Sequence, residues 1–444
     1  MGTIADKLER VLKTKKDIQS ALVKNGKYVP DKLPFKYYPY LIDNMNIDGL
    51  VGMYYGKGLT NEELSKDPTW YDTSGNGNDL KFKNLAWKLN SGAGIYVYDF
   101  TRWNYNIGGL TSVERTGSKI QFKAPSNALT GNVYDEIRNI GYNYNFKIRV
   151  TGLKFGNRFS IRKGTSSILM NITQDGIYHV NTIVEEDWDQ KRLYIFINSI
   201  VGPDVDLIVE QIPDYEGAIC FNGIDDCAVC DNFPILTKEK GYTAMALRKW
   251  INKKNAYDGL ISNKNAWSNG CAFIVEYSDG IKDGTISFGR NTYVDYSQDF
   301  LVYQTSQNYN GNQILTGDDT EGTTVLNLGR LASSGFSQYS NFAIYALCVI
   351  DHDTSDAERQ IVINKWKQYY PELFPDQAWT VTGKTNEDED RATVKNLTGN
   401  GNDLVLSNFA FAGDSGYGRY TWNFNNWNVK KIQNQCLKLV LRLI

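Results

Sequence analysis

The stretch Trp70-Tyr71-Asp72-Thr73-Ser74-Gly75-Asn76-Gly77-Asn78-Asp79-Leu80 decides the fold of this chain, because it occurs twice. The second copy reads Thr398-Gly399-Asn400-Gly401-Asn402-Asp403-Leu404. The copies stay in step without a gap as far as Trp103 and its counterpart Trp427. Over about thirty positions roughly half are identical, and a repeat of this length indicates one structural unit used twice.

The residue types indicate what that unit is. Asn76 and Gly77 tolerate positive φ, which predicts a tight hairpin turn. Apolar and polar residues then alternate over Leu80–Leu85 and again over Tyr96–Phe100, which is the period of a β-strand. Because an isolated hairpin is barely stable, each copy should open a larger sheet.

Length and composition narrow the class of protein. A chain of 444 residues is too long to fold around one hydrophobic core, and this length predicts about two to four domains. Aromatic residues make up 13%, glycine is plentiful and proline is scarce, which favours mainly-β structure. Lys+Arg 48 against Asp+Glu 50 leaves no basic excess for nucleic acid.

The sequence has no apolar run long enough to predict a membrane-spanning segment. The charged N-terminus has no apolar signal core, so we expect synthesis in a cytoplasm.

Six cysteines are too few for a disulfide scaffold in a chain of this length. Cys227 and Cys230 have the spacing of a zinc or redox pair. A second pair is missing, and His179 and His352 are the only histidines. Cysteines buried in a strand are therefore the favoured interpretation.

Residues 3–25 predict a helix. Apolar residues recur at alternating spacings of four and three, and Lys15 is the one polar residue in the series: Ile4, Leu8, Val11, Lys15, Ile18 and Leu22. This is coiled-coil spacing, and Asn25 with Gly26 supplies the end of the helix. A lone helix of this length is marginal, so we expect it to pack on copies of itself or on a partner. Packing on its own domain is the alternative.

The same segment resembles the N-terminal module of many bacteriophage tail and fibre proteins. The residues that carry the resemblance are Ile4–Leu8, Thr14, Lys15, Ile18, Ala21–Val23, Val29, Pro30, Phe35, Tyr38 and Ile42. The resemblance implies that residues 1–48 attach the protein to a virion or to its trimer mates. It implies other virion proteins as partners and a homo-oligomer, with a trimer favoured.

A second resemblance concerns the body of the chain. Phe221–Asp226 is similar to the Phe-x-Gly-x-Asp-Asp strand of laminin-G-like, concanavalin A-like lectins, and the repeated Ser-Gly-Asn-Gly-Asn-Asp turn fits the same pattern. The buried strand Phe342–Ile350 is followed by Ser355 and Glu358, the ends of a capping box that should open a helix running to about Tyr370. The resemblance implies a jelly-roll sandwich that binds host-surface glycans.

The fold class we expect is mainly β, a concanavalin A-like jelly-roll sandwich with an inserted β-sandwich and an N-terminal helical anchor. The lectin-like sandwich is split, 49–106 plus 216–375, with further strands at 243–250 and 272–277. Short strands separated by glycine and asparagine turns predict the insertion over 107–215: 119–123, 146–150, 158–162, 193–197 and 205–210.

Residues 376–444 form a partial second repeat. Half a sandwich leaves a sheet edge open. Either the half-units share a sheet, another chain completes it, or the chain is a shortened form.

Sugar binding requires exposed aromatic rings beside hydrogen-bonding side chains. Trp70, Trp103, Tyr105 and Trp267 are the candidates for glycan binding. Core packing is the alternative for Trp70 and Trp103, because Trp103 recurs at Trp427 and a repeated position fits a packing role.

Calcium is the one cofactor the sequence suggests. Asp72, Asn76, Asn78 and Asp79 offer the hard oxygen ligands that calcium prefers. The alternative is that these residues stabilise the turn through their own backbone.

Catalysis is not expected. A glycoside hydrolase on this fold needs carboxylates on alternate strand positions, and the laminarinase-type signature has apolar residues between them. The acidic stretches Glu185–Asp189 and Glu387–Asp390 lack those spacers and predict solvated loops. With two histidines a histidine-based triad is not expected, and no phosphate-binding glycine loop is present.

Together these features predict a structural virion protein, a head or tail fibre that presents lectin-like domains to host glycans and is located in the virion. Ile212–Ala218, which leads into the Asp-Asp strand, resembles fibre proteins of crAss-like phages that infect gut Bacteroides. A polysaccharide depolymerase on the same fold, and a capsid-decorating protein without a glycan ligand, are the alternatives.

Overall fold

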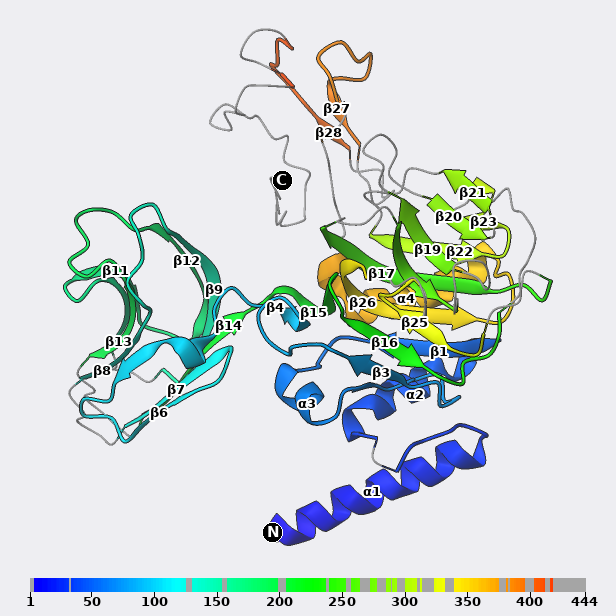
Figure 1. Cartoon of the computed structure of the whole chain (residues 1–444), viewed down its shortest axis with the longest axis horizontal. Coiled ribbons are helices and arrows are strands. Elements are labelled where there is room, and N and C mark those ends of the chain that lie inside the picture. Colours follow the sequence, from blue (N-terminus) through cyan, green and yellow to red (C-terminus); the bar gives the residue numbers. More distant parts are fainter. Residues whose placement is uncertain are drawn as a thin grey trace. The chain divides into compact units, whose positions relative to one another are not determined.

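The computed structural model describes residues 4–31, 33–124, 130–153, 158–198, 205–236, 239–252, 257–263, 272–277, 285–288, 290–293, 300–309, 312–313, 323–331, 339–374, 381, 384–395, 403–411 and 416–417 (Figure 1). The chain divides into two compact units, Met1–Lys365 and Trp366–Ile444. The first unit is mainly β and holds two sandwiches and an N-terminal helix, as the sequence predicts.

The first sandwich consists of two antiparallel sheets. One has the order β24-β23-β22-β17-β26-β15-β4, and β1 also pairs with the long strand β26. Its strands are β1 (Leu50–Tyr55), β4 (Gly92–Ile95), β15 (Asp214–Asn222), β17 (Thr243–Asn252), β22 (Leu301–Thr305), β23 (Asn308–Tyr309), β24 (Asn312–Gln313) and β26 (Asn341–Ile350).

The facing sheet has the order β19-β18-β25-β16-β3-β2. Its strands are β2 (Thr69–Trp70), β3 (Leu80–Lys83), β16 (Cys227–Cys230), β18 (Tyr257–Ser262), β19 (Ala272–Tyr277) and β25 (Leu326–Leu328). A further hairpin joins β20 (Thr285–Phe288) and β21 (Arg290–Tyr293). The expected strands at 243–250, 272–277 and 342–350 are all present.

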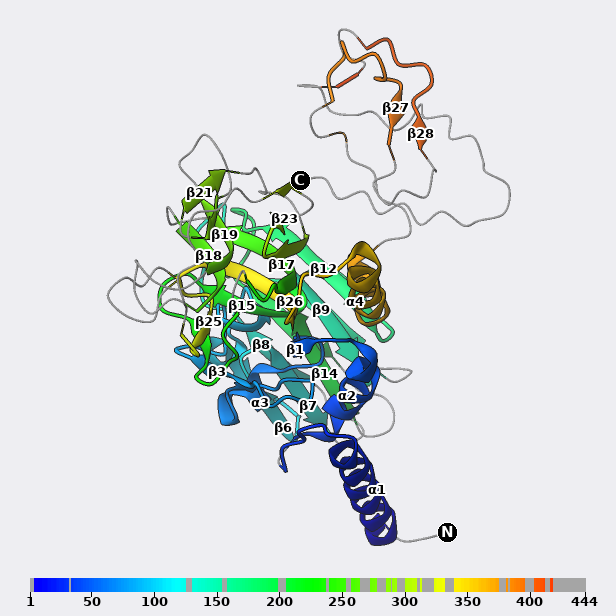
Figure 2. The ribbon, with the colours of Figure 1, turned by 90° about the vertical axis from the view of Figure 1, so that its right-hand side faces the viewer.

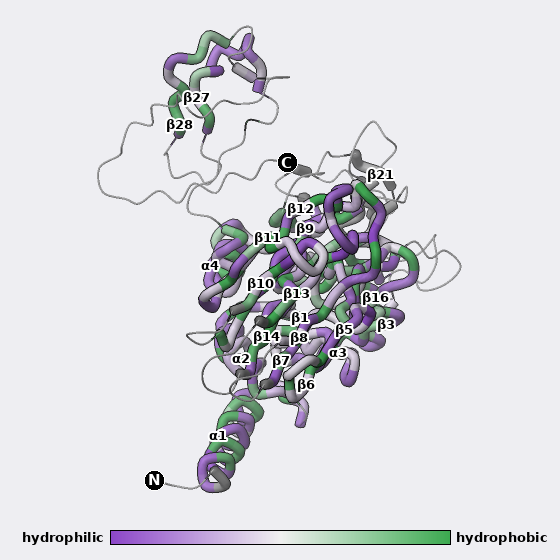
Figure 3. The backbone as a smooth tube through the Cα atoms, turned by 90° about the vertical axis from the view of Figure 1, so that its left-hand side faces the viewer, coloured by the Kyte–Doolittle hydropathy of each residue, from purple (hydrophilic) through white to green (hydrophobic). Residues whose placement is uncertain are grey.

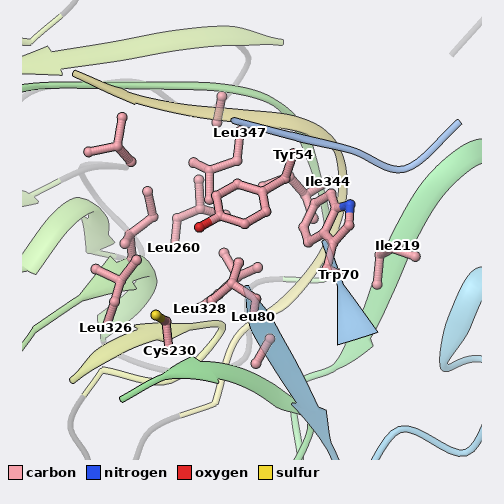
Figure 4. Close-up of a cluster of buried hydrophobic side chains, with 14 of the residues drawn as sticks. Tyr54, Trp70, Leu80, Ile219, Cys230, Leu260, Leu326, Leu328, Ile344 and Leu347 are labelled. Atoms are coloured by element: carbon pink, nitrogen blue, oxygen red, sulfur yellow. The ribbon is translucent and has the colours of Figure 1, made fainter. Parts of the chain in front are cut away.

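Apolar residues of both sheets form the core of this sandwich. Figure 4 shows Tyr54, Trp70, Leu80 and Ile344 within it. Trp70 is fully buried, and its indole Nε1 donates to the carbonyl of Tyr55 at 2.8 Å. The first repeat copy therefore supplies central core residues, which explains why it organises the chain.

A second sandwich lies between β4 and β15 in the sequence, with its own core. One sheet has the order β11-β10-β13-β8-β5 and the other β12-β9-β14-β7-β6. The strands are β5 (Asn104–Asn106), β6 (Ser112–Arg115), β7 (Lys119–Ala124), β8 (Thr130–Tyr134), β9 (Asn143–Thr151), β10 (Arg158–Lys163), β11 (Ser167–Ile172), β12 (Gly176–Ile183), β13 (Leu193–Asn198) and β14 (Val205–Ile212). All five strands predicted here are confirmed.

The repeated motif forms a longer loop than the expected two-residue turn. β2 pairs with β3 through Trp70 and Leu80, so residues 71–79 connect them. Positive φ occurs at Gly75 and Gly77, not at two successive residues. The prediction of a tight turn at Asn76 and Gly77 is wrong, because the loop wraps around the carboxylate of Asp72 instead of reversing directly.

The predicted strand over Tyr96–Phe100 is also wrong. β4 ends at Ile95, and Phe100–Arg102 forms a 3-10 helix, η3. The side chain of Gln211 takes the place of a strand partner. Its Oε1 accepts from the amides of Val97 and Tyr98, and its Nε2 donates to the Tyr98 carbonyl. Tyr98 and Phe100 can then both enter the core of the second sandwich.

The N-terminal segment consists of α1 (Ile4–Lys24), η1 (Phe35–Tyr37), α2 (Tyr38–Asp43) and η2 (Asn44–Asn46) (Figure 2). Leu22 is buried at the base of α1, whereas Leu8 and Val11 are more than half exposed. The chain after α1 packs on the repeated loop. The Tyr28 amide donates to the Gly75 carbonyl, and a Cβ on Gly77 would lie 2.7 Å from the Tyr28 ring.

Short helices complete the first unit and its boundary. The capping box before α4 (Asp356–Tyr369) is confirmed: the Ser355 amide and hydroxyl both donate to Glu358, and the Glu358 amide donates back to the Ser355 hydroxyl. α3 (Asn61–Lys66) begins with the same arrangement at Thr60. Among the described residues, no helix combines the length and apolar character needed to cross a bilayer.

The described residues of the second unit match the first repeat copy in strand pairing and in several backbone angles. Its η4 (Pro371–Leu373) precedes β27 (Thr393–Val394) and β28 (Leu404–Val405). The pairing of β27 with β28 has the same register as that of β2 with β3, because each paired residue lies 324 positions after its counterpart. The unusual backbone angles recur at matched positions: φ is 66° at Asn84 and Asn408, 57° at Trp87 and 52° at Phe411, and 127° at Gly92 and 146° at Gly416. The repeat is therefore structural and not only a likeness of sequence.

Candidate functional site

The predicted glycan-binding aromatic residues do not form one site. Trp70 and Trp103 lie in the cores of the first and second sandwich, with 0% and 2% of their surface exposed. Their prediction as sugar platforms is corrected, because a buried ring cannot stack on a sugar. Tyr105 is 48% exposed on β5, with the Arg115 guanidinium 4.5 Å from its ring centroid. Trp267 lies outside the described residues.

The four residues suggested for calcium form a hydrogen-bonded loop. The Asp72 Oδ1 accepts from the amides of Met53 and Ser74, and its Oδ2 accepts from the Ser74 hydroxyl and the Asn78 amide. Asp79 accepts from the Asp72 amide. With both Asp72 oxygens facing N–H and O–H donors, the arrangement favours the turn-stabilising role, and burial raises the pKa of Asp72.

The two asparagines of this set attach the loop to β1. Asn76 Nδ2 donates to the Leu50 carbonyl at 2.6 Å, and Asn78 Nδ2 donates to the Val51 carbonyl at 2.8 Å. Their amide nitrogens, not their oxygens, thus face the strand. Within the described ranges no cluster of three or more His, Cys, Asp or Glu residues is placed to hold a metal ion.

The acidic stretches lie on loops, as expected. Asp189 accepts from the amide and hydroxyl of Thr165 and from the hydroxyl of Ser166. In the other stretch, Asp388 accepts from the amide of Thr385. These carboxylates serve loop structure. Cys227 and Cys230 are unpaired and buried in β16, which confirms the interpretation as buried strand cysteines.

A different surface is the outer face of the sheet β11-β10-β13-β8-β5, whose backbone Figure 3 shows from that side. Residues such as Ile161 and Ile195 point into the core, so the alternate residues point outward. The strand register aligns the outward residues in two rows that each cross all five strands. We call them the two-row face: Asn104, Tyr134, Tyr194, Arg162 and Ile168 in one row, and Asn106, Asn132, Phe196, Ser160 and Asn171 in the other.

Arginines and aromatic rings stack on this face. The Arg162 guanidinium lies 3.9 Å from the centroid of Phe196, and its Nε donates to the Ser160 hydroxyl. Tyr134 and Tyr194 stack with their centroids 4.9 Å apart, and the guanidinium of Arg192, just before β13, lies 5.2 Å from the Tyr134 centroid. Such stacking fixes flexible arginine side chains in place.

Two buried polar atoms on this face have no hydrogen-bond partner, the Oδ1 of Asn132 and the Nε of Arg192. Buried polar atoms are nearly always paired, so an unpaired one calls for an explanation. Asn104, Asn106 and Asn171 are exposed around them. The face thus combines partly buried rings, exposed amides and unsatisfied hydrogen-bonding atoms, the mixture that a polar ligand with apolar faces requires.

Sequence reasoning missed this surface. The available signal was the alternation of Tyr194 and Phe196 with buried residues in β13, and the paired Asn104 and Asn106 in β5. Alternation shows that residues share a face, but it does not show which strands are neighbours. The rows exist only once the order β11-β10-β13-β8-β5 is known.

No protein-family model matches this chain, and no curated protein matches it. Among solved structures, a truncated AlyQ with CBM32 and alginate lyase domains is 8% identical and covers 56% of this chain and 100% of its own, with a TM-score of 0.23. Trypanosoma rangeli sialidase in complex with sialic acid is also 8% identical and covers 68% of each chain, with a TM-score of 0.26. At these scores the likeness carries no information about what this chain does.

Proposed function

We propose that this protein binds carbohydrate through the two-row face of its second sandwich. The observation that carries the proposal is the pair of cross-strand rows, in which the partly exposed rings of Tyr134 and Phe196 lie among asparagine and arginine side chains. The buried ring of Tyr194 supports them by stacking on Tyr134. Sugars present C–H faces and hydroxyl edges together. Aromatic rings pack on the former, and amides and guanidiniums hydrogen-bond the latter.

The unsatisfied atoms support a ligand with hydroxyl groups. A hydroxyl group suits either atom, because its hydrogen can be donated to the Asn132 Oδ1 and its oxygen can accept from the Arg192 Nε. Because the rings are fixed by stacking, little side-chain freedom is lost on binding. A surface for contact between protein copies is the competing use of such a face, and the experiment below separates the two.

The test is a glycan array followed by calorimetry on the full chain and on two variants, Phe196→Ala and Asn132→Ala. Each should weaken binding by about tenfold, the effect of one aromatic contact or one hydrogen bond to a ligand. The matched control is Asn181→Ala, an exposed asparagine on β12 in the opposite sheet.

If no glycan binds, or if Asn181→Ala weakens binding equally, the proposal fails. If Phe196→Ala instead changes the sedimentation coefficient of the unliganded protein, the face is a contact between copies.

The wider role we propose is that of a virion fibre whose N-terminus attaches to other phage virion proteins. α1 supports this proposal, because its apolar seam is exposed at Leu8 and Val11 while its base is fixed through Leu22. A helix held at one end and apolar along the other suits assembly with copies or a partner. Imaging with an antibody against residues 1–48 tests the location, and the antibody should label virions. Labelling that is found in the infected cell but not on virions contradicts the proposal.

We propose a binding role without catalysis. The support is that Asp189 accepts from the loop between β10 and β11, that Asp388 accepts from its own loop, and that the ten residues of the two-row face include no carboxylate. A depolymerase would need two carboxylates on one face. Release of reducing ends from a bound polysaccharide would contradict this view and favour the enzyme.

A further inference from the structure

The charge of the two-row face distinguishes among classes of sugar. Arg162 is one of its ten residues, the Arg192 guanidinium lies over its Tyr134, and none of the ten is acidic. Asp189, in the loop before β13, accepts from Thr165 and Ser166. The face is therefore positive within a chain whose net charge is −2.

Two other partly buried arginines of this sandwich have carboxylate partners, whereas Arg115 donates to the Trp103 carbonyl. Arg138 pairs with Asp135 at 2.8 Å, and Arg149 pairs with Glu210 at 3.3 Å and Glu216 at 3.1 Å. Across the described part of the chain, neither Arg162 nor Arg192 forms an ion pair. Burial lowers the pKa of Arg162, as expected for a guanidinium without a nearby anion.

From these contrasts we infer that the ligand of the two-row face is an anionic polysaccharide, whose carboxylate or sulfate groups pair with Arg162 and Arg192. In Arg162 the Nε donates to the Ser160 hydroxyl and Nη1 donates to the Thr165 carbonyl at 3.2 Å, so Nη2 is the group left for an anion. The N–H groups of a guanidinium match the oxygens of a carboxylate or a sulfate. The Nε of Arg192 is a buried donor without a partner in the protein. This inference rests on the proposed glycan-binding role and specifies its ligand class.

The experiment compares polymers that differ only in charge. Polygalacturonate is paired with its carboxyl-reduced form, and dextran sulfate with dextran, in affinity electrophoresis of the full chain at about 0.1 M salt, where charges more than about 10 Å apart are screened. The charged member of at least one pair should bind about tenfold or more tightly, the effect expected of a charge-assisted hydrogen bond. The pair that responds identifies carboxylate or sulfate.

Arg192→Gln and Arg162→Gln should each remove most of the preference for charge, and Arg192→Lys should restore only part of it. The matched control is Arg149→Gln, which should keep the preference because Arg149 already has carboxylate partners. If Arg149→Gln loses the preference for charged polymers to the same extent, the attraction of polyanions is unspecific and the inference is overturned.

The remaining outcomes separate this inference from the proposed function. If charged and neutral polymers bind equally and Phe196→Ala weakens both, glycan binding stands and the anionic class is wrong. If no polymer binds and the glycan array is also blank, the proposed function itself is wrong.

Discussion

At the scale of single residues, Asp72 shows how the repeated motif holds its loop together. Its carboxylate collects four donors from β1 and from the repeated loop. Buried donors that lose an acceptor retain their full desolvation cost. The aspartate in the repeated motif is therefore explained by hydrogen bonding inside the loop.

Asp72→Ala should lower the free energy of unfolding by about 3 kcal/mol or more, since several buried donors lose their acceptor. The free energy of unfolding of Asp72→Asn should lie between those of the wild type and Asp72→Ala, because the remaining oxygen can still accept from Met53 and Ser74. Urea unfolding measures both, with the exposed Asp187→Ala as control. An Asp72→Ala protein as stable as the control contradicts this account.

The same geometry gives an expectation for calcium. Since Asp72 faces donors on both oxygens, adding calcium chloride or removing it with EDTA should leave the melting temperature unchanged within about 1 °C, whereas a ligand at a hundredfold excess over its Kd adds about 2.7 kcal/mol. Differential scanning calorimetry measures the melting temperature with calcium and with EDTA. An increase with calcium that Asp72→Asn abolishes would restore the loop as a calcium site.

Asp226 gives a prediction for pH. It is fully buried; its Oδ2 accepts from the Ser91 hydroxyl at 2.6 Å and the Asn222 amide at 2.9 Å, and its Oδ1 has no partner. Burial raises its pKa to about 6, above the value near 4 of an unfolded aspartate. The folded state thus holds this proton more tightly, so the stability due to this group is greatest below about pH 4 and is lost as pH rises through about 6.

Asp226→Asn should therefore flatten the decline in melting temperature between about pH 4 and 6. Its exposed neighbour provides the control, because Asp225→Asn leaves the buried carboxyl in place. Identical pH profiles for the wild type and Asp226→Asn would show that this carboxyl does not titrate in that window.

At the scale of elements, α1 and the two repeated hairpins illustrate opposite cases. The hairpins keep the same register and backbone angles in two settings, so their geometry is local to the motif. α1 exposes Leu8, Val11 and Leu12 at more than half of their surface. An exposed apolar seam is stable only when another helix covers it.

The double variant Leu8→Glu with Val11→Glu should convert the expected trimer to a monomer, because charges replace the apolar seam at two successive layers. Sedimentation velocity at micromolar concentration measures the change. Lys13→Glu, on the exposed side beside Asp17, should leave the assembly intact. A wild-type chain that is monomeric under these conditions contradicts the coiled-coil hypothesis.

At the scale of the whole molecule, the second sandwich is inserted at one point of the first. Ile95 and Asp214, which flank it, are cross-strand partners in β4 and β15. Its core residues all lie between Tyr98 and Val209. A domain with its own core and adjacent ends can be exchanged without disturbing its host.

Replacing residues 96–213 by a short glycine-rich loop should therefore leave the first sandwich folded, with cooperative unfolding, while glycan binding is lost. The excised segment should fold by itself and keep the binding. Circular dichroism and calorimetry on both products measure this. A remainder that unfolds without cooperativity would show that the two cores depend on each other.

The sequence by itself determined the repeat, most of the strands, the capping box and the N-terminal helix, because these depend on periodicity and on bonds between near neighbours. It did not determine the path of residues 96–100, where the distant side chain of Gln211 replaces a strand partner. Only the tertiary structure decided that Trp70 and Trp103 are buried and that the two-row face exists. Exposure and adjacency depend on which strands become neighbours, and five separate segments of chain must align before the arginines, rings and amides meet.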